Sequence, residues 1–148
     1  MSLKRQFVVQ DHGKEFVLYA GLLDEAHAQG LRRIETRLLQ IPTADNGELA
    51  VVSAVVETEK GTFAGLGDAS PANVKPHLRA HLIRLAETRA KARALRDAIN
   101  VSMAAYEELG EEPSDHTEGR GARVEGRGAG PGPRLSTFDP AQGRRTTR

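Results

Sequence analysis

The stretch LIRLAETRAKARALR, residues 82–96, decides the fold that this sequence predicts. It is the centre of residues 77–99, which contain no glycine or proline and many residues of high helix propensity. Asn100 follows as a suitable helix terminator. We therefore expect one long helix over residues 77–99.

Two sides of this helix are apolar. At about 100° per residue, the first side forms a stripe that we expect to face a sheet. The second side carries small residues that would let a neighbouring helix or subunit approach closely, which predicts a homo-oligomer. The stripe consists of Leu78, Leu85, Ala92, Leu95 and Ile99, and the second side of Ala90, Ala94 and Ala98 with Ile83.

Basic residues lie between these sides. Arg89, Arg93 and Arg96 form one edge beside the leucine stripe, while Arg84 and Lys91 flank its other side. Grouped guanidinium groups repel one another unless a partner neutralises them, and their fork matches two oxygens of a phosphate. The alternative is that they pair with acids of the sheet or of a second subunit.

Three strands are expected before this helix, in residues 31–41, 48–59 and 62–67. Asn46-Gly47 and Lys60-Gly61 supply the turns between them. Alternation places Arg33 and Arg37 on one face of the first strand. The apolar run 49–56 predicts a second strand covered on much of both faces. The expected sheet is an antiparallel meander of three strands, or of four if residues 5–10 join it.

The remaining body contributes shorter elements. Residues 15–19 either stay extended or open a helix, and residues 21–29 form a helix that closes at Gly30. Ser70-Pro71 indicates a helix start with one short turn over residues 71–74, and residues 101–109 predict a second short helix. The fold class is thus α+β with a β-β-β-α core.

Residues 111–148 differ in composition from residues 1–110. They are rich in Gly, Pro and Arg and repeat the sequence EGRG at positions 118–121 and 125–128. Such a segment buries too little apolar surface to fold, so we expect one domain over residues 1–110 and a disordered tail. The tail is either a linker or an arm that contacts phosphate.

Composition excludes several classes of site and protein. The chain has no cysteine, which removes disulfides and thiolate metal sites and fits a reducing compartment. No apolar run nears the ~20 residues that span a bilayer, so we expect a cytoplasmic protein without a membrane partner. The net charge is +1 and aromatic residues make up 4%, which argues against a row of base-stacking rings.

Catalytic and metal patterns are weak. His77 and His81 have a metal-binding spacing, but no third ligand completes a site. Gly65-Leu-Gly67 lacks a phosphate-loop lysine, and nothing brings Asp24 and Asp68 together as paired carboxylates. We therefore expect neither an enzyme nor a cofactor.

Residues 55–67, VVETEKGTFAGLG, followed by residues 82–96, resemble the core of single-strand annealing proteins of the Rad-fifty-two and DdrA-like type. The resemblance covers residues 33–100. It implies a β-β-β-α core that assembles into rings, with single-stranded nucleic acid in a basic groove between hairpin and helix. It also implies backbone-binding roles for Arg89, Lys91, Arg93 and Arg96. The Lys-Arg and Phe-Gly pairs frequent in that family are replaced here by Arg96-Asp97 and Asn100.

The resulting hypothesis is a non-enzymatic protein of DNA repair or recombination that binds and anneals single-stranded DNA as a homo-oligomer. Annealing needs the phosphates neutralised while the bases stay free to pair. The alternative is a homo-oligomeric structural or regulatory interaction protein that binds no nucleic acid. The candidate nucleic-acid-binding residues are Arg33, Arg37, Arg84, Arg89, Lys91, Arg93 and Arg96.

Overall fold

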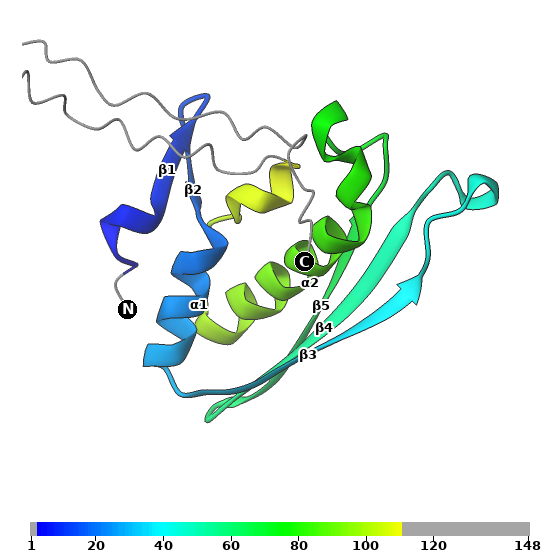
Figure 1. The fold of residues 1–148 in the computed structure, drawn as a ribbon. Coiled ribbons are helices and arrows are strands. Elements are labelled where there is room, and N and C mark those ends of the chain that lie inside the picture. Colours follow the sequence, from blue (N-terminus) through cyan, green and yellow to red (C-terminus); the bar gives the residue numbers. More distant parts are fainter. Residues whose placement is uncertain (1–2, 111–148) are drawn as a thin grey trace, which may run out of the picture. The chain divides into compact units, whose positions relative to one another are not determined.

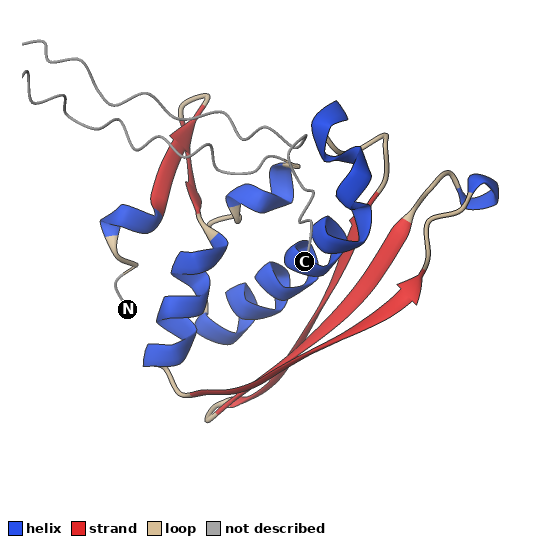
Figure 2. Ribbon diagram, in the orientation of Figure 1, coloured by secondary structure: helices blue, strands red, loops and turns tan. Residues whose placement is uncertain are grey.

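The computed structural model describes residues 3–110. The expected tail, residues 111–148, lies outside the described residues. The described part is α+β, as predicted, with the strands and helices arranged as in Figures 1 and 2. In chain order these elements are β1 (Val8–Asp11), β2 (Lys14–Val17), α1 (Tyr19–Ala28), β3 (Leu31–Gln40), β4 (Ala50–Thr58), β5 (Gly61–Ala69) and α2 (Leu82–Ile99).

The predicted three-stranded meander is confirmed. The strands are antiparallel in the order β3-β4-β5, and Ala54 of β4 lies between Thr36 of β3 and Gly65 of β5. The N-terminal strand does not join this sheet. Positive φ angles at His12 and Gly13 reverse the chain, so β1 pairs with β2 in a separate hairpin. Of the two alternatives that the sequence left open, the sheet therefore has three strands and not four.

The sheet is covered by helices on one face. Along β4, residues alternate between buried and half-buried, so one face of this strand is fully covered and the other is covered in part. Among the described elements, α1 and α2 both lie on the same side of the sheet (Figure 2). The face towards α2 carries Ala50, Val52, Ala54, Val56 and Thr58.

Helix α2 turns its alanine side to the sheet. Gly65 and Gly67 of β5 leave room for the helix backbone, and a Cβ at Gly65 would lie 2.7 Å from both the carbonyl oxygen of Ala90 and the amide nitrogen of Ala94. Ala90, Ala94 and Ala98 are therefore core residues and not a subunit contact. The leucine stripe, apart from Leu78 in the turn before the helix, lies on the opposite side of α2, where α1 packs (Figure 1).

The ends of α2 differ in how well the sequence predicted them. Asn100 ends the helix in the left-handed conformation, with φ 57°, as expected of a terminator. The helix begins at Leu82 and not at residue 77, because Pro76–His81 forms a 3₁₀ turn and His81, with ψ 31°, leaves the helical region. Ser70-Pro71 begins the expected short turn and no helix.

The segment after α2, up to Gly110, contains no second α-helix. The prediction of a helix over residues 101–109 was wrong, because only Tyr106–Leu109 forms a 3₁₀ turn. The reason is a tertiary contact, since the amide of Val17 donates a 3.0 Å hydrogen bond to the carbonyl of Ala104 and holds this backbone beside β2. No helix in the described part of the chain is long and apolar enough to cross a membrane.

Candidate nucleic-acid interface

Arg89 is a buried structural residue. Its side chain is 3% exposed, and its guanidinium donates to the carbonyl oxygens of Asp68 (2.7 Å), Asn73 (3.0 Å) and Glu107 (3.4 Å), as well as to the side-chain oxygen of Asn73. Burial lowers the pKa of Arg89, against the field of the Asp68 carboxylate. The expectation that Arg89 meets phosphate at an open edge is therefore corrected: this side chain fastens α2 to the loop after β5.

Arg93 and Arg96 share one carboxylate. Nε of Arg93 lies 3.2 Å from Oε2 of Glu108, and Nη1 of Arg96 lies 2.9 Å from Oε1. Arg93 also donates to the carbonyl of Leu66 at 2.7 Å, and its Nη1 lies 3.5 Å from Asp68. The basic edge thus meets acids of its own subunit.

Lys91 lies on the side of α2 that faces the start of α1. Its ammonium lies 5.3 Å from the centre of the Tyr19 ring and 3.8 Å from Glu87, which also accepts a hydrogen bond from Thr36 of β3. Burial raises the pKa of Tyr19, and the carboxylates of Glu87 and Glu107 raise it further. The ammonium of Lys91 is therefore already engaged by Glu87 and Tyr19.

Arg33 and Arg37 lie on the outer face of the sheet. Their partners in β4 are Glu57 and Ser53, which are not on the face towards α2. Arg33 pairs with Glu35 at 3.2 Å and Glu57 at 3.5 Å, whereas the Arg37 side chain makes no polar contact with the described residues. The sheet arginines and the arginines of α2 therefore do not share a groove.

Arg84 is the one candidate on α2 that is both exposed and unpaired within residues 3–110. It lines a cleft of about 340 Å³ together with Arg79 and Ile83, opposite Pro42 and Glu48 of the loop between β3 and β4. Arg79 is likewise exposed and has no side-chain partner among the described residues. Ile83 is 43% exposed, so the cleft offers two free guanidinium groups around an apolar surface.

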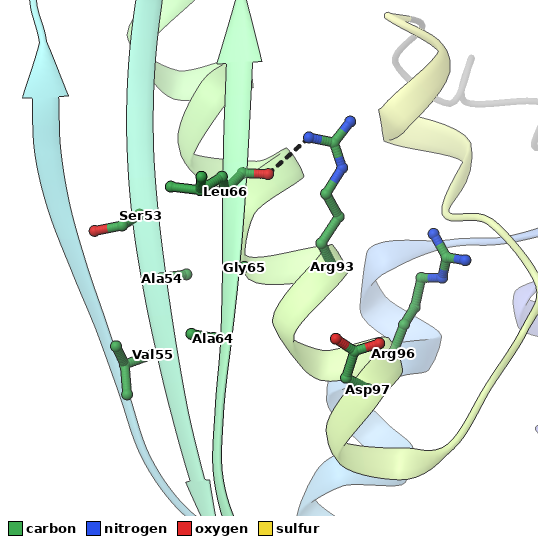
Figure 3. Close-up of a pocket in the computed structure, with 9 residues that line it drawn as sticks. All are labelled: Ser53, Ala54, Val55, Ala64, Gly65, Leu66, Arg93, Arg96 and Asp97. Carbon is green, nitrogen blue, oxygen red and sulfur yellow. Dashed lines mark hydrogen bonds between the residues drawn. The ribbon is translucent and has the colours of Figure 1, made fainter.

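A second cavity, of about 620 Å³, lies at the open edge of β5 (Figure 3). Its wall on the sheet side includes Val55, Ala64 and Leu66, and α2 contributes Arg93, Arg96 and Asp97. Figure 3 shows Arg93 reaching along this edge to the carbonyl of Leu66. Both cations of this cavity are already engaged.

Other residues considered for catalysis or metal binding are dispersed. His77 and His81 are exposed in the 3₁₀ turn before α2. Asp24 pairs with Lys4 at 2.9 Å, and Asp68 accepts from Asn73 on a different part of the fold. Residues 3–110 contain no group of three or more side chains able to hold a metal ion.

Sequence reasoning missed Arg79 and Glu108. Arg79 precedes Arg84 by five positions, and a continuous helix was expected there. Instead, a 3₁₀ turn places Arg79 beside the loop between β3 and β4. Glu108 lies in neither of the places expected to supply acids, the sheet and a second subunit, because it follows α2 in the same chain. Its signal was the acidic pair Glu107-Glu108 shortly after the arginine helix.

The environment of Glu107 leads us to expect that the free energy of unfolding depends on pH. Both its carboxylate oxygens accept from the amide of Tyr19, the first residue of α1, at 3.0 and 2.9 Å. Burial raises the pKa of Glu107, so the folded state holds its proton at a pH where the unfolded chain has lost it. This contribution to stability is complete below the unfolded pKa and is lost as the pH rises through the raised folded pKa.

We expect the free energy of unfolding of the wild type, relative to Glu107→Gln, to increase as the pH falls from about 8 to about 4. Urea unfolding of both proteins across this range measures the difference. A difference that is independent of pH, or that shrinks on acidification, would contradict the assignment.

No protein-family model, curated protein or solved structure matches this chain in the three comparisons made.

Proposed function

We propose that this protein binds single-stranded DNA in the cleft between the β3–β4 loop and the start of α2. The observation that carries the proposal is the pair Arg79 and Arg84, which are exposed and unpaired within the described residues and line one cleft with Ile83. Unpaired guanidinium groups gain most from phosphate, because no internal ion pair has to break first.

In the proposed mechanism the protein binds the phosphate backbone and leaves the bases unbound. The two arginines neutralise neighbouring phosphates, while the aliphatic side chain of Ile83 contacts sugar or base without a stacking ring. The bases then stay available to pair with a second strand, as annealing requires. The role in DNA repair or recombination, without enzymatic activity, follows the resemblance of residues 55–67 and 82–96 to annealing proteins.

The double variant Arg79→Ala/Arg84→Ala is expected to weaken binding to a labelled oligothymidylate at least tenfold at low salt. Each lost phosphate contact should also lower the slope of log K against log salt by about 0.7. Fluorescence anisotropy at several salt concentrations measures both quantities.

The matched control is Arg33→Ala/Arg37→Ala, which removes the same charge from the outer face of the sheet. We expect its affinity at about 0.15 M salt to stay within about twofold of the wild type, since long-range effects between exposed charges are screened at that ionic strength. If the wild type does not bind at low salt, or if only the outer-face variant loses affinity, the proposal is wrong.

The second candidate is a homo-oligomeric interaction protein without nucleic-acid binding. It is favoured by four aliphatic side chains that remain exposed on the sheet and its connecting loop, Leu38 at 43%, Leu39 at 55%, Ile41 at 62% and Leu66 at 57%. Mass measurement by light scattering without DNA tests it. An oligomer that dissociates in Leu39→Lys and does not bind the oligonucleotide would favour this candidate, whereas a monomer would exclude it.

A further inference from the structure

The Arg93–Arg96 pair holds a carboxylate in the manner in which two arginines hold a phosphate. Each oxygen of Glu108 meets a different guanidinium, at 3.2 and 2.9 Å, and the Glu108 side chain is only 12% exposed. The cavity at the edge of β5 gives this pair access to solvent, because both arginines line it and the Arg93 side chain is 40% exposed.

The backbone that carries Glu108 is held by other contacts. We call residues 104–110 the strap. Three sets of hydrogen bonds fix it. The amide of Val17 donates to the carbonyl of Ala104, the amide of Tyr19 donates to the carboxylate of Glu107, and Arg89 donates to the carbonyl of Glu107. These three contacts do not involve the Glu108 carboxylate, although its Oε1 also accepts a 3.1 Å hydrogen bond from the amide of Ala105 within the strap. Displacing the carboxylate costs that one local hydrogen bond while the other contacts of the strap remain, and Glu108→Gln keeps a side-chain oxygen that can accept it.

The pair also has hydrogen-bonding capacity that the carboxylate does not use. Nε of Arg96 is buried and has no hydrogen-bond partner among the described residues, although burying an unpaired donor is costly. A phosphate group presents more acceptor oxygens than a carboxylate and carries the charge that Glu108 now supplies.

We propose that Arg93 and Arg96 form a second anion site, specific for a phosphate group of nucleic acid, which the Glu108 carboxylate fills until a phosphate displaces it. The nucleic-acid source of that phosphate rests on the proposed function. Because Glu108 is tethered beside the site, it competes at high effective concentration and keeps the site weak in the wild type.

Glu108→Gln removes this competitor and is expected to tighten binding of a labelled oligothymidylate about five- to tenfold, a gain comparable to one ordinary hydrogen bond. The gain should vanish in Glu108→Gln/Arg93→Ala/Arg96→Ala. The matched control is Asp97→Asn, which removes the same charge from an exposed acid lining the same cavity. Its affinity should change less than twofold. An equal gain in Asp97→Asn, or none in folded Glu108→Gln, would overturn the proposal.

Glu108→Asp provides a second variant if the Glu108→Gln variant does not fold. It keeps the charge but withdraws the carboxylate by one methylene, so a smaller gain is expected, and no gain in either variant would contradict the inference. Titration of Glu108→Gln with inorganic phosphate, followed by the NMR signal of the Arg93 Nε–H group, tests the site without DNA. A phosphate-dependent shift without DNA binding would overturn the proposed function alone, whereas DNA binding without this shift would overturn the second site alone.

Discussion

Replacing Gly67 with alanine is expected to lower the free energy of unfolding by about 3 kcal/mol, at the upper end of overpacking effects. The added Cβ would collide with the carbonyl oxygen of Ala86 and the amide nitrogen of Ala90. Both atoms belong to the backbone of α2, which cannot move aside as a flexible side chain would. The helix must shift away from β5, and contacts along the whole core are lost. Urea unfolding followed by circular dichroism measures the change.

Gly47→Ala is the control for this prediction. Gly47 has a φ of 71° and nothing within 4 Å of an added Cβ, so only backbone strain is introduced. We expect a cost of about 1 kcal/mol there. If Gly67→Ala were no more destabilising than Gly47→Ala, the close approach of α2 to β5 would be disproved.

The second large effect is expected from Arg89→Met, which should lower the free energy of unfolding by about 3 to 4 kcal/mol. Methionine fills much of the same space but cannot donate, so the carbonyl oxygens of Asp68, Asn73 and Glu107 lose their partner in a partly buried place. Thermal and urea unfolding measure the loss.

Arg84→Met is the matched control, because Arg84 is exposed and its side chain has no partner among the described residues. Its stability should stay within about 0.5 kcal/mol of the wild type. The reverse order of effects, with Arg89→Met neutral and Arg84→Met destabilising, would refute the assignment of Arg89 as a structural residue.

The strands and turns were predictable because their signals are local. Gly47 and Gly61 both adopt positive φ angles, which glycine adopts without strain, and residues on each side alternate along the strands. The end of α2 at Asn100 and the end of α1 before Gly30 follow from the same local chemistry. These features need no knowledge of distant partners.

The orientation of α2 was not predictable from its own pattern. The helix is buried on most of its circumference, between the sheet and α1, so polarity does not say which apolar side meets which layer. The deciding residues are Gly65 and Gly67 on β5, because glycine there favours a close helix backbone with alanine side chains.

The partners of the arginines depended on long-range structure as well. The spacing of Arg89, Arg93 and Arg96 is the same whether a phosphate or an internal acid neutralises them. Glu108 reaches them only because β2 holds the strap beside α2, a contact between distant parts of the chain. Arg79 and Arg84 have no side-chain partner among the described residues, and this too depends on which distant parts of the chain lie beside them.

The most direct test of the proposed DNA-binding cleft is a map of backbone amide shifts in ¹⁵N-labelled protein titrated with a short single-stranded oligonucleotide. The proposal predicts that the largest shifts fall on residues 79–84 of the 3₁₀ turn and α2 and on residues 42–48 of the loop opposite. Shifts confined to the outer-face strand positions around Arg33 and Arg37, or no shifts at saturating oligonucleotide, would contradict it.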